Sequence, residues 1–480
     1  MNYRLVSHIL GKVLFLEAAL MVPSLIVSLI YREGDTSDFL ISMLILAISG
    51  LLLAWIKPRK NTLFERDGMI IVALSWLSLA IFGGLPFFFN GAIPSYVDCI
   101  FESVSGFTTT GSSILTNVEI MPKGLMFWRS FTHWFGGLGV LVFFLILLPS
   151  MSGSTQYLMR AESPGPSPGK LVPKIRDTSK ILYAIYFVLT GICILCLIIA
   201  GMPVFDSVLH ALGVAGTGGF GIKNNSVAYY NNSAIYLILS VFMLLFGTNF
   251  IVYFYIIKRH FTEVKKNSEI KLFGIIIAAA TTIITLNTKG VFASWWEAFY
   301  QAFFQVSSLI STTGYTTADY NVWPLLSKFT LILIMFVGSC AGSTAGGLKQ
   351  IRVLIMLKSI KRLVKKSLHP RSVISIKADG KNVEDEQVSN ISLFCFAYFL
   401  IMGIAIFLVS FDNHDFETTF TAVLTAISNV GPAFGLAGPT GNFAFFSDFS
   451  KIVLSLCMLI GRLEILPILL LFNINSWKKA

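Results

Sequence analysis

Long apolar segments recur along this 480-residue chain, and shorter polar stretches separate them. Runs such as GVLVFFLILLP and LILIMFVG belong to segments near the length of about 20 residues that crosses a bilayer as a helix. The first apolar segment lacks a small-residue cleavage site, so we expect a retained span rather than a removed signal peptide. The pattern predicts a polytopic helical membrane protein.

Composition supports this class over a string of soluble domains. Hydrophobic residues make up 55% of the chain, the mean hydropathy is +0.75, and 13% of residues are charged, against about 25% in soluble domains. The six cysteines lie in or beside apolar segments. Cys193 and Cys196 form a C-x-x-C pair, but a zinc or redox site needs further partners and polar access. We predict that this pair only packs between helices.

The net charge of +11 is concentrated in particular segments. The stretch 349–377 carries nine Lys or Arg and no acid, whereas 411–450 has acids and no Lys or Arg. The positive-inside rule places the basic segments in the cytoplasm, and we prefer this to nucleic-acid binding because no soluble domain accompanies them. Both termini are then cytoplasmic, which requires an even number of crossings. The other basic clusters are Lys57, Arg59 and Lys60; Arg160, Lys170, Lys174, Arg176 and Lys180; and Lys258, Arg259, Lys265 and Lys266.

Four stretches with one layout lie in the outward segments. Each has an apolar run of roughly ten residues, too short to span, then small or hydroxyl residues, then a glycine. Asp98 and Asp206 each stand 13 residues before their glycine, where we expect them to cap a short helix. A longer apolar segment precedes and follows each stretch, so the unit is span, re-entrant half-helix, loop, span. The stretches are DCIFESVSGFTTTGSS, DSVLHALGVAGTGGFG, YQAFFQVSSLISTTGYTT and TTFTAVLTAISNVGPAFG, with Gly111, Gly219, Gly314 and Gly431 in the equivalent place.

The second stretch contains GTGGFG at 216–221, which matches the G-x-G-x-x-G pattern of dinucleotide-binding turns. That site needs a helix opening on its last glycine and an acid about 20 residues further on. Gly221 instead leads into the polar loop IKNNSVAYYNNS, and the first downstream acid is Glu263. The glycines therefore need another explanation.

Ion coordination by backbone explains the glycines. Irregular backbone survives at membrane depth where it lines a water-filled path or is buried in protein. Four such loops around an axis can direct carbonyls inward and replace the water shell of a cation, and glycine permits the positive φ that this requires. The segment TTGYT at 312–316 is close to the T-V-G-Y-G filter of potassium channels. We predict that each stretch forms one quarter of a selectivity filter.

With these motifs the chain resembles the membrane subunit, TrkH type, of the Trk/Ktr/HKT superfamily of K⁺ transporters, over nearly its whole length. The resemblance implies that each repeat supplies filter carbonyls from its glycine and the residue before it. A serine in place of the first-repeat glycine goes with sodium conduction in relatives, so Gly111 favours K⁺. The implied K⁺ site consists of Thr110 and Gly111, Gly218 and Gly219, Thr313 and Gly314, and Val430 and Gly431.

The segment GSCAGSTAGGLK at 338–349 interrupts the span after the third filter stretch. Its four glycines destabilise a helix interior, since each costs about 1 kcal/mol relative to alanine. Close helix packing through small residues is one interpretation. The other, which the resemblance implies and we prefer, is a flexible intramembrane loop that obstructs the pore. The gate residues are Gly338, Gly342, Ser343, Thr344, Gly346 and Gly347.

Arg462 lies within the last apolar segment. A buried arginine costs at least about 2.5–3.5 kcal/mol at the bilayer centre unless it faces a partner or water. We prefer a pore-facing Arg462 that raises the barrier to cations, as the resemblance implies, over an inter-helix salt bridge. His133 and His210 are predicted to be packed or hydrogen-bonded rather than metal ligands.

The whole pattern predicts an all-α polytopic membrane protein with ten transmembrane helices and four repeats in pseudo-fourfold arrangement. Its expected function is K⁺ uptake across the bacterial cytoplasmic membrane, with K⁺ as the transported ion and no organic cofactor. Na⁺ uptake and cation/K⁺ symport are the alternatives, and an intramembrane enzyme is disfavoured because acids, histidines and nucleophiles are scattered singly. The resemblance implies a homodimer and a cytosolic nucleotide-binding TrkA-like subunit. The expected units are 1–66 (two leading helices), 67–175, 176–266, 267–380 and 381–480.

Overall fold

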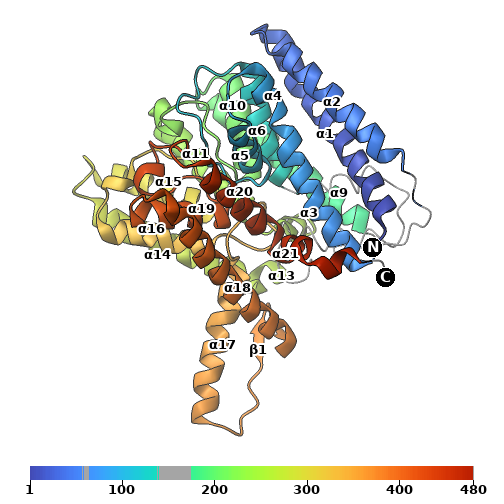
Figure 1. The fold of residues 1–480 in the computed structure, drawn as a ribbon. Helices are drawn as coiled ribbons and strands as arrows, with labels where there is room; N and C mark the ends of the chain where they lie inside the picture. The colour runs from blue at the N-terminus through green and yellow to red at the C-terminus, as the bar shows by residue number, and fades with distance from the viewer. Residues whose placement is uncertain (57, 59–63, 138, 140–174, 479–480) are drawn as a thin grey trace.

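The computed structural model describes the whole chain except residues 57, 59–63, 138, 140–174 and 479–480. One predicted basic cluster (Lys57, Arg59 and Lys60), part of another (Arg160, Lys170 and Lys174) and most of the end of the first repeat lie outside the described residues. The described part is mostly helical (Figure 1).

The elements of the first half of the chain are α1 (Tyr3–Tyr31), α2 (Thr36–Ala54), α3 (Glu65–Gly83), α4 (Leu85–Asn90), α5 (Tyr96–Phe107), α6 (Lys123–Gly137), α9 (Ile175–Ile199), α10 (Val204–Gly216), η1 (Ser226–Tyr230) and α11 (Ser233–Gly247). Those of the second half are α12 (Phe250–Ile257), α13 (Phe261–Lys266), α14 (Ser268–Thr288), α15 (Trp295–Ile310), η2 (Tyr320–Val322), α16 (Leu325–Val337), α17 (Gln350–Leu368), β1 (Ile376–Ala378), β2 (Lys381–Val383), α18 (Asp385–Val409), η3 (Ser410–Asp412), α19 (Phe416–Ser428), η4 (Gly435–Ala437), α20 (Asp448–Leu463), α21 (Leu466–Phe472) and η5 (Ile474–Trp477).

Six helices in the described part are long and apolar enough to cross a membrane, and seven if one bent pair counts as a span. The bent pair is α11 and α12, which meet at an angle of 92° at a short break. The sequence pattern predicted a span after the second stretch but not its bend, because apolar composition does not encode a bend. The count of ten spans stays a prediction.

The leading helices α1 and α2 form an antiparallel pair at one edge of the molecule (Figure 1). They approach closely at Gly11 and Gly50, where a Cβ at either position would crowd the other helix's backbone. Small residues allow such close approach between membrane helices. Both chain ends lie together, since the Met1 ammonium donates a 3.1 Å hydrogen bond to the carbonyl of Lys478.

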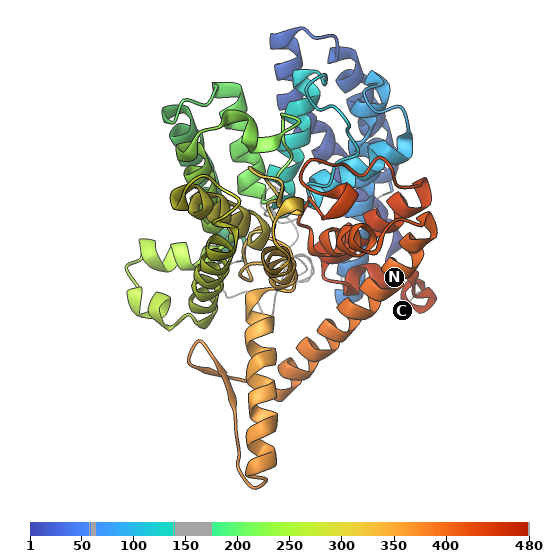
Figure 2. The same ribbon diagram turned by 90° about the vertical axis from the view of Figure 1, so that its left-hand side faces the viewer.

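Helix α17 projects from the body of the molecule, and α18 returns to it (Figure 2). Between them β1 and β2 pair antiparallel, with Ile376 opposite Val383. The all-α prediction is wrong at this hairpin, although Asp379–Gly380 between the strands is a strong hairpin turn signal. A small cluster of Ile355, Ile376, Val388 and Ile391 packs the hairpin against both helices.

Short helices α5, α10, α15 and α19 run from the predicted outer segments towards the middle of the body, and each precedes one of the four glycines. Their last turns are buried throughout. Asp98 and Asp206 do not cap them, because the N-caps are Ser95 and Pro203 and each acid is already the third helical residue. Asp98 instead forms a 2.6 Å ion pair with Lys451, and Asp206 accepts a 2.7 Å hydrogen bond from the Tyr230 hydroxyl.

Candidate ion-binding site

Helices α5, α10, α15 and α19 end with the same backbone turn. In each, an amide donates to the carbonyl five residues earlier, which is the longer bond of a Schellman motif. The geometry satisfies carbonyls that the end of a helix would otherwise leave unpaired. The four bonds are Thr110 N to Ser105 O (2.9 Å), Gly218 N to Gly213 O (2.9 Å), Thr313 N to Ser308 O (2.8 Å) and Val430 N to Thr425 O (3.0 Å).

Backbone conformation repeats in the residues that follow. The residue two positions before each glycine is left-handed without being glycine, with φ of 56°, 55°, 57° and 54° at Thr109, Thr217, Thr312 and Asn429. Such conformations are uncommon for these residue types and cluster at functional sites. None of these four residues is among the predicted filter residues, although their fixed place before each glycine was a usable signal.

The four glycines are also left-handed, with φ of 88°, 73°, 85° and 102° in chain order. A Cβ added at each would approach a carbonyl of the next loop, so the sites lack room for a side chain as well as requiring positive φ. The pairs run round a closed cycle, from Gly111 to the Gly218 carbonyl, from Gly219 to Thr313, from Gly314 to Val430, and from Gly431 back to Thr110. The structure therefore brings all eight predicted filter residues together in one ring.

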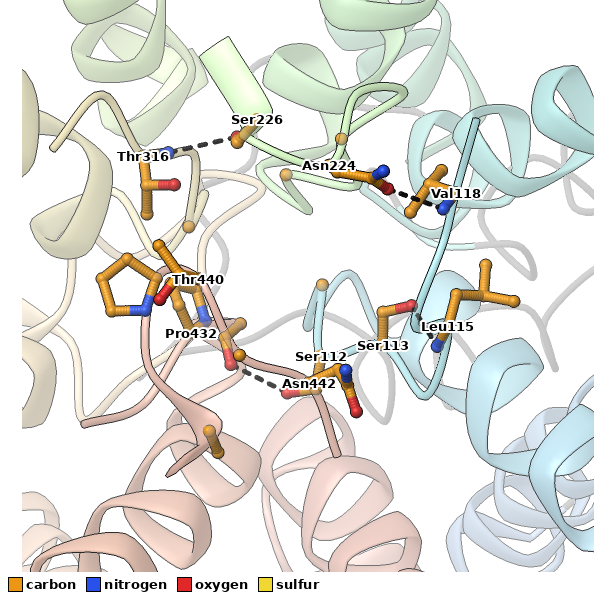
Figure 3. Close-up of a pocket in the computed structure, with 18 of the residues that line it drawn as sticks. Ser112, Ser113, Leu115, Val118, Asn224, Ser226, Thr316, Pro432, Thr440 and Asn442 are labelled. Carbon is orange, nitrogen blue, oxygen red and sulfur yellow. Dashed lines mark hydrogen bonds between the residues drawn. The ribbon is translucent and has the colours of Figure 1, made fainter. Parts of the chain in front are cut away.

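One cavity of about 200 Å³ opens above this ring. All four glycines line it, together with hydroxyl, amide and backbone groups. Figure 3 shows the loops converging on it, with the Ser112 hydroxyl donating a 2.9 Å hydrogen bond to the carbonyl of Gly431. Two cationic residues, Arg129 and Lys223, also line the cavity, and each pairs with an acid, Glu102 at 2.5 Å and Glu119 at 3.5 Å.

The glycine-rich segment 338–349 lies against the opposite side of the ring. The amide of Gly346 donates a 2.8 Å bond to the Thr312 hydroxyl, and the amide of Gly347 donates a 2.9 Å bond to the Ser428 carbonyl. Gly338, Gly342 and Gly347 have positive φ, so the span between α16 and α17 is irregular as predicted. Ser343 and Thr344 are buried in it.

Glu269, at the start of α14, holds both ends of this segment. Its Oε1 accepts hydrogen bonds from the amides of Ala341 (2.7 Å) and Ile351 (3.1 Å). The side chain is buried, and Lys349 is buried nearby with its ammonium donating to the Ala345 carbonyl. Glu269 is not among the predicted site residues, because nothing local to it indicates contact with a segment about 80 positions away in the chain.

Arg462, on α20, reaches the same segment. Its guanidinium donates to the carbonyl of Thr344 at 2.7 Å, to that of Gly137 at 2.5 Å, and to that of Gly136. The side chain is half-buried. The neighbouring acid Glu464 pairs elsewhere, with Arg352 at 2.6 Å. Arg462 thus joins the interrupted span to the end of α6.

Both histidines singled out in the sequence are hydrogen-bonded, as predicted. His133 Nδ1 lies 2.8 Å from the Gly106 carbonyl, and His210 Nδ1 lies 2.8 Å from the carbonyl of Asp206. In the described part of the chain, no cluster of three or more His, Cys, Asp and Glu residues could hold a metal ion. Cys193 and Cys196 lie on α9 as free thiols.

Comparison with known proteins matches residues 36–479 to the TrkH model, described as cation transport protein. The chain belongs to the TrkH family. It is 34% identical over 488 residues to the Trk system potassium uptake protein TrkH of Salmonella typhimurium, with full coverage of both chains. It is 32% identical to the Trk system potassium uptake protein TrkG of Escherichia coli, with 99% of each chain covered.

The fold agrees with this membership. The crystal structure of the potassium transporter TrkH from Vibrio parahaemolyticus matches with a TM-score of 0.89 at 32% identity, over all of both chains. TrkH-family membership and the apolar helices make the chain an integral membrane protein. It is a transporter-family protein and not an enzyme, which removes the intramembrane-enzyme alternative.

Proposed function

We propose that this protein mediates selective K⁺ uptake across the bacterial cytoplasmic membrane. The single observation that carries the proposal is the closed cycle of four left-handed glycines that line one cavity. The names of the relatives, which are Trk system potassium uptake proteins, support K⁺ as the transported ion.

In the proposed mechanism, K⁺ sheds water at the cavity and binds backbone carbonyls of the ring. Inward-facing carbonyls replace the hydration shell of K⁺, so the ion loses little free energy of solvation when it enters the ring. Helices α5, α10, α15 and α19 direct their C-terminal ends at the ring, and each end carries roughly half a negative charge. The ligands are carbonyls of Thr110 and Gly111, Gly218 and Gly219, Thr313 and Gly314, and Val430 and Gly431.

The repeats proposed for the chain are 67–175, 176–266, 267–380 and 381–480, after two leading helices in 1–66. The identical helix ends and glycine conformations support fourfold repetition. We keep ten spans in this proposal, two leading helices and two spans in each of the four repeats, with α5, α10, α15 and α19 as re-entrant half-helices between the spans.

Segment 338–349 and Arg462 form the proposed gate. Hydrogen bonds from the segment to Thr312 and Ser428 support a blocking position just below the ring. The Arg462 guanidinium would hold the segment there through the Thr344 carbonyl, and its charge would oppose a cation passing beside it. Gly338, Gly342, Ser343, Gly346 and Gly347 supply the flexibility.

The proposed assembly is a homodimer with a cytosolic nucleotide-binding TrkA-like subunit. The basic helix α17, which extends beyond the body, supports a cytoplasmic docking region. Both termini are proposed to be cytoplasmic, and the contact between Met1 and Lys478 supports their lying on one side. Cross-linking of purified protein and cysteine accessibility at both termini test these points.

Flux of K⁺ and Na⁺ into liposomes that contain the purified protein tests the function. We expect K⁺ uptake to exceed Na⁺ uptake, and equal or greater Na⁺ flux would favour the Na⁺ alternative. K⁺ movement that requires a gradient of a second cation would favour symport. Complementation of a bacterium that lacks K⁺ uptake systems, measured at limiting K⁺, tests the same proposal in cells.

A further inference from the structure

Arg129 on α6 is buried where the first and second filter loops meet. Its side chain exposes 3% of its surface, and every polar atom of its guanidinium donates to one of these loops or to the helix before them. Nε donates to Glu102 at 2.5 Å, one terminal nitrogen donates to the Gly221 carbonyl at 2.9 Å, and the other donates to the Ser113 hydroxyl at 3.1 Å. The planar guanidinium of Arg129 thus links the first filter loop to the second.

Glu102 on α5 extends the same contact into the first loop. Its Oε2 accepts a 3.1 Å hydrogen bond from the amide of Ile114, and its Oε1 also accepts a 3.0 Å bond from Ser113. Ser113 and Ile114 are the second and third residues after Gly111 in the chain. The carboxylate therefore holds the outer end of the first filter strand through both its oxygens.

His133, one helical turn after Arg129, holds the second loop. The amide of Phe220 donates a 3.2 Å bond to His133 Nε2, so Nδ1 carries the proton that is donated to the Gly106 carbonyl at 2.8 Å. The Phe220 ring lies between the two side chains, 3.8 Å from the Arg129 guanidinium carbon and 4.1 Å from the histidine ring centroid. Phe220 and Gly221 follow Gly219, so one face of α6 fixes where the second strand leaves the ring.

These contacts bear on selectivity because they set the separation of two neighbouring strands. Gly111 already lies against the Gly218 carbonyl, so a small shift between the loops changes how carbonyls surround an ion. Buried polar groups that are fully hydrogen-bonded are rigid and well specified.

We propose that Arg129 and Glu102 are positioning residues that determine K⁺ over Na⁺ selectivity by fixing the first filter strand against the second. The inference rests on the proposed function. Neither residue contacts the ion in this assignment, since both act through backbone amides, carbonyls and the Ser113 hydroxyl.

Position and charge have separable effects at this site. Arg129 lines the cavity, so an unpaired guanidinium would repel cations there, and Glu102 neutralises it. A charge at the mouth acts equally on K⁺ and Na⁺, because both are monovalent, and it alters total flux. Strand spacing acts on the ratio of the two fluxes. The K⁺/Na⁺ flux ratio therefore reports positioning.

The test uses the full-length protein in liposomes, with Arg129→Lys, Glu102→Gln and the control Lys328→Met. Lysine keeps the charge, but a single ammonium cannot reach Glu102, Gly221 and Ser113 together in the fork geometry of arginine. Glu102→Gln keeps the shape and removes the charge. Lys328 forms a 2.6 Å ion pair with Glu417 at the start of α19, so it fastens a short helix from a more exposed position, and its ammonium lies 5.8 Å from the ring centroid of Phe434, three residues beyond Gly431.

We expect Arg129→Lys and Glu102→Gln each to lower the K⁺/Na⁺ flux ratio by about tenfold, the effect of about 1.4 kcal/mol of differential binding. Lys328→Met should leave the ratio at the wild-type value. Thermal unfolding in detergent, compared in K⁺ and in Na⁺, gives a second measurement. We expect K⁺ to stabilise the wild type more than Na⁺ does, and both variants to lose that difference.

Three results would overturn the proposal. The first is a folded Arg129→Lys or Glu102→Gln with an unchanged ratio, and the second is an equal change of the ratio in Lys328→Met. The third is loss of fold in both variants in either salt, which would make the pair a stability element alone. A wild-type protein without K⁺ preference, or an unchanged ratio in Gly111→Ser, would instead count against the proposed filter itself.

Discussion

The side-chain amide of Asn429 donates a 2.9 Å hydrogen bond to the hydroxyl of Thr110, 319 residues earlier in the chain. The same amide donates to the Met458 carbonyl at 2.9 Å. One side chain thus joins the fourth loop to the first and to α20, which closes the cycle of loops that chain order leaves open. Contacts of this kind indicate which substitutions should alter ion selection, gating or stability alone.

Gly111→Ser should weaken K⁺ over Na⁺ discrimination. The backbone there has φ of 88°, and an added Cβ would overlap the Gly218 carbonyl, so the strands must separate. We expect the K⁺/Na⁺ flux ratio in liposomes to fall by about tenfold. Gly34→Ser is the control, because φ is 92° there but nothing lies within 4 Å of a Cβ. An unchanged ratio in Gly111→Ser would contradict the filter assignment.

Arg462→Ala should raise K⁺ flux. The change frees the Thr344 carbonyl and removes a positive charge near the proposed path. We expect an increase of about tenfold, which corresponds to about 1.4 kcal/mol less barrier, with little change in thermal stability. Flux assays beside thermal unfolding measure both quantities.

Arg352→Ala is the comparison for Arg462, because Arg352 is a buried arginine with an acidic partner. Its side chain hydrogen-bonds segment 338–349 only at the Leu348 carbonyl, one turn earlier, at 3.4 Å. Loss of the Arg352 guanidinium leaves the Glu464 carboxylate without its ion-pair partner. We expect the free energy of unfolding to fall by about 3–5 kcal/mol and K⁺ flux not to rise. If Arg462→Ala itself lowers thermal stability and does not raise K⁺ flux, the result contradicts the assignment of Arg462 as a gate residue.

Removal of residues 342–347 should raise K⁺ flux without changing the K⁺/Na⁺ ratio. The segment bonds to Thr312 and Ser428 below the ring, so its loss clears the proposed path and leaves the filter backbone in place. Removal of 370–375, in the segment that precedes β1 outside the membrane body, serves as the control. Loss of all flux in a folded protein would favour a packing role for the glycine-rich segment.

Glu269→Ala should also raise flux, because its Oε1 holds both ends of that segment. Each lost hydrogen bond destabilises the closed arrangement by about 0.5–1.5 kcal/mol. Glu269→Gln keeps an acceptor oxygen for the amides of Ala341 and Ile351. We expect a smaller increase of K⁺ uptake in Glu269→Gln, and equal uptake in the two variants would argue against the hydrogen-bonding role.

Stability should fall in acid through Asp415, the N-cap of α19. Hydrogen bonds from the Thr418 hydroxyl and amide lower the pKa of its carboxyl in the folded protein. A lowered folded pKa gives stability that is present above the unfolded pKa, near 3.9, and lost as pH falls through the folded pKa. Asp415→Ala should cost about 1 kcal/mol at neutral pH. Asp415→Asn should keep the cap, and a pH dependence below pH 5 equal to that of wild type would contradict this.

Local features of the sequence determined the class of protein and the place of the four loops. Apolar run length follows from bilayer thickness, and a glycine marks positive φ wherever other residues are strained. Gly111, Gly219, Gly314 and Gly431 could therefore be found without a structure. The Asp379–Gly380 turn was also readable, although the all-α prediction passed over it.

Only the tertiary structure decided which groups meet. Arg129 hydrogen-bonds Glu102 and Gly221, and Glu269 hydrogen-bonds the interrupted span. No local sequence pattern relates these positions, and none encodes the 92° bend between α11 and α12. Asp98 shows the same limit, since its place suggested a cap and packing gave it Lys451 as a partner. An unpaired polar or charged group inside the membrane costs several kcal/mol, so each buried one pairs with a partner. That partner is set by the packing of the helices and not by distance along the chain.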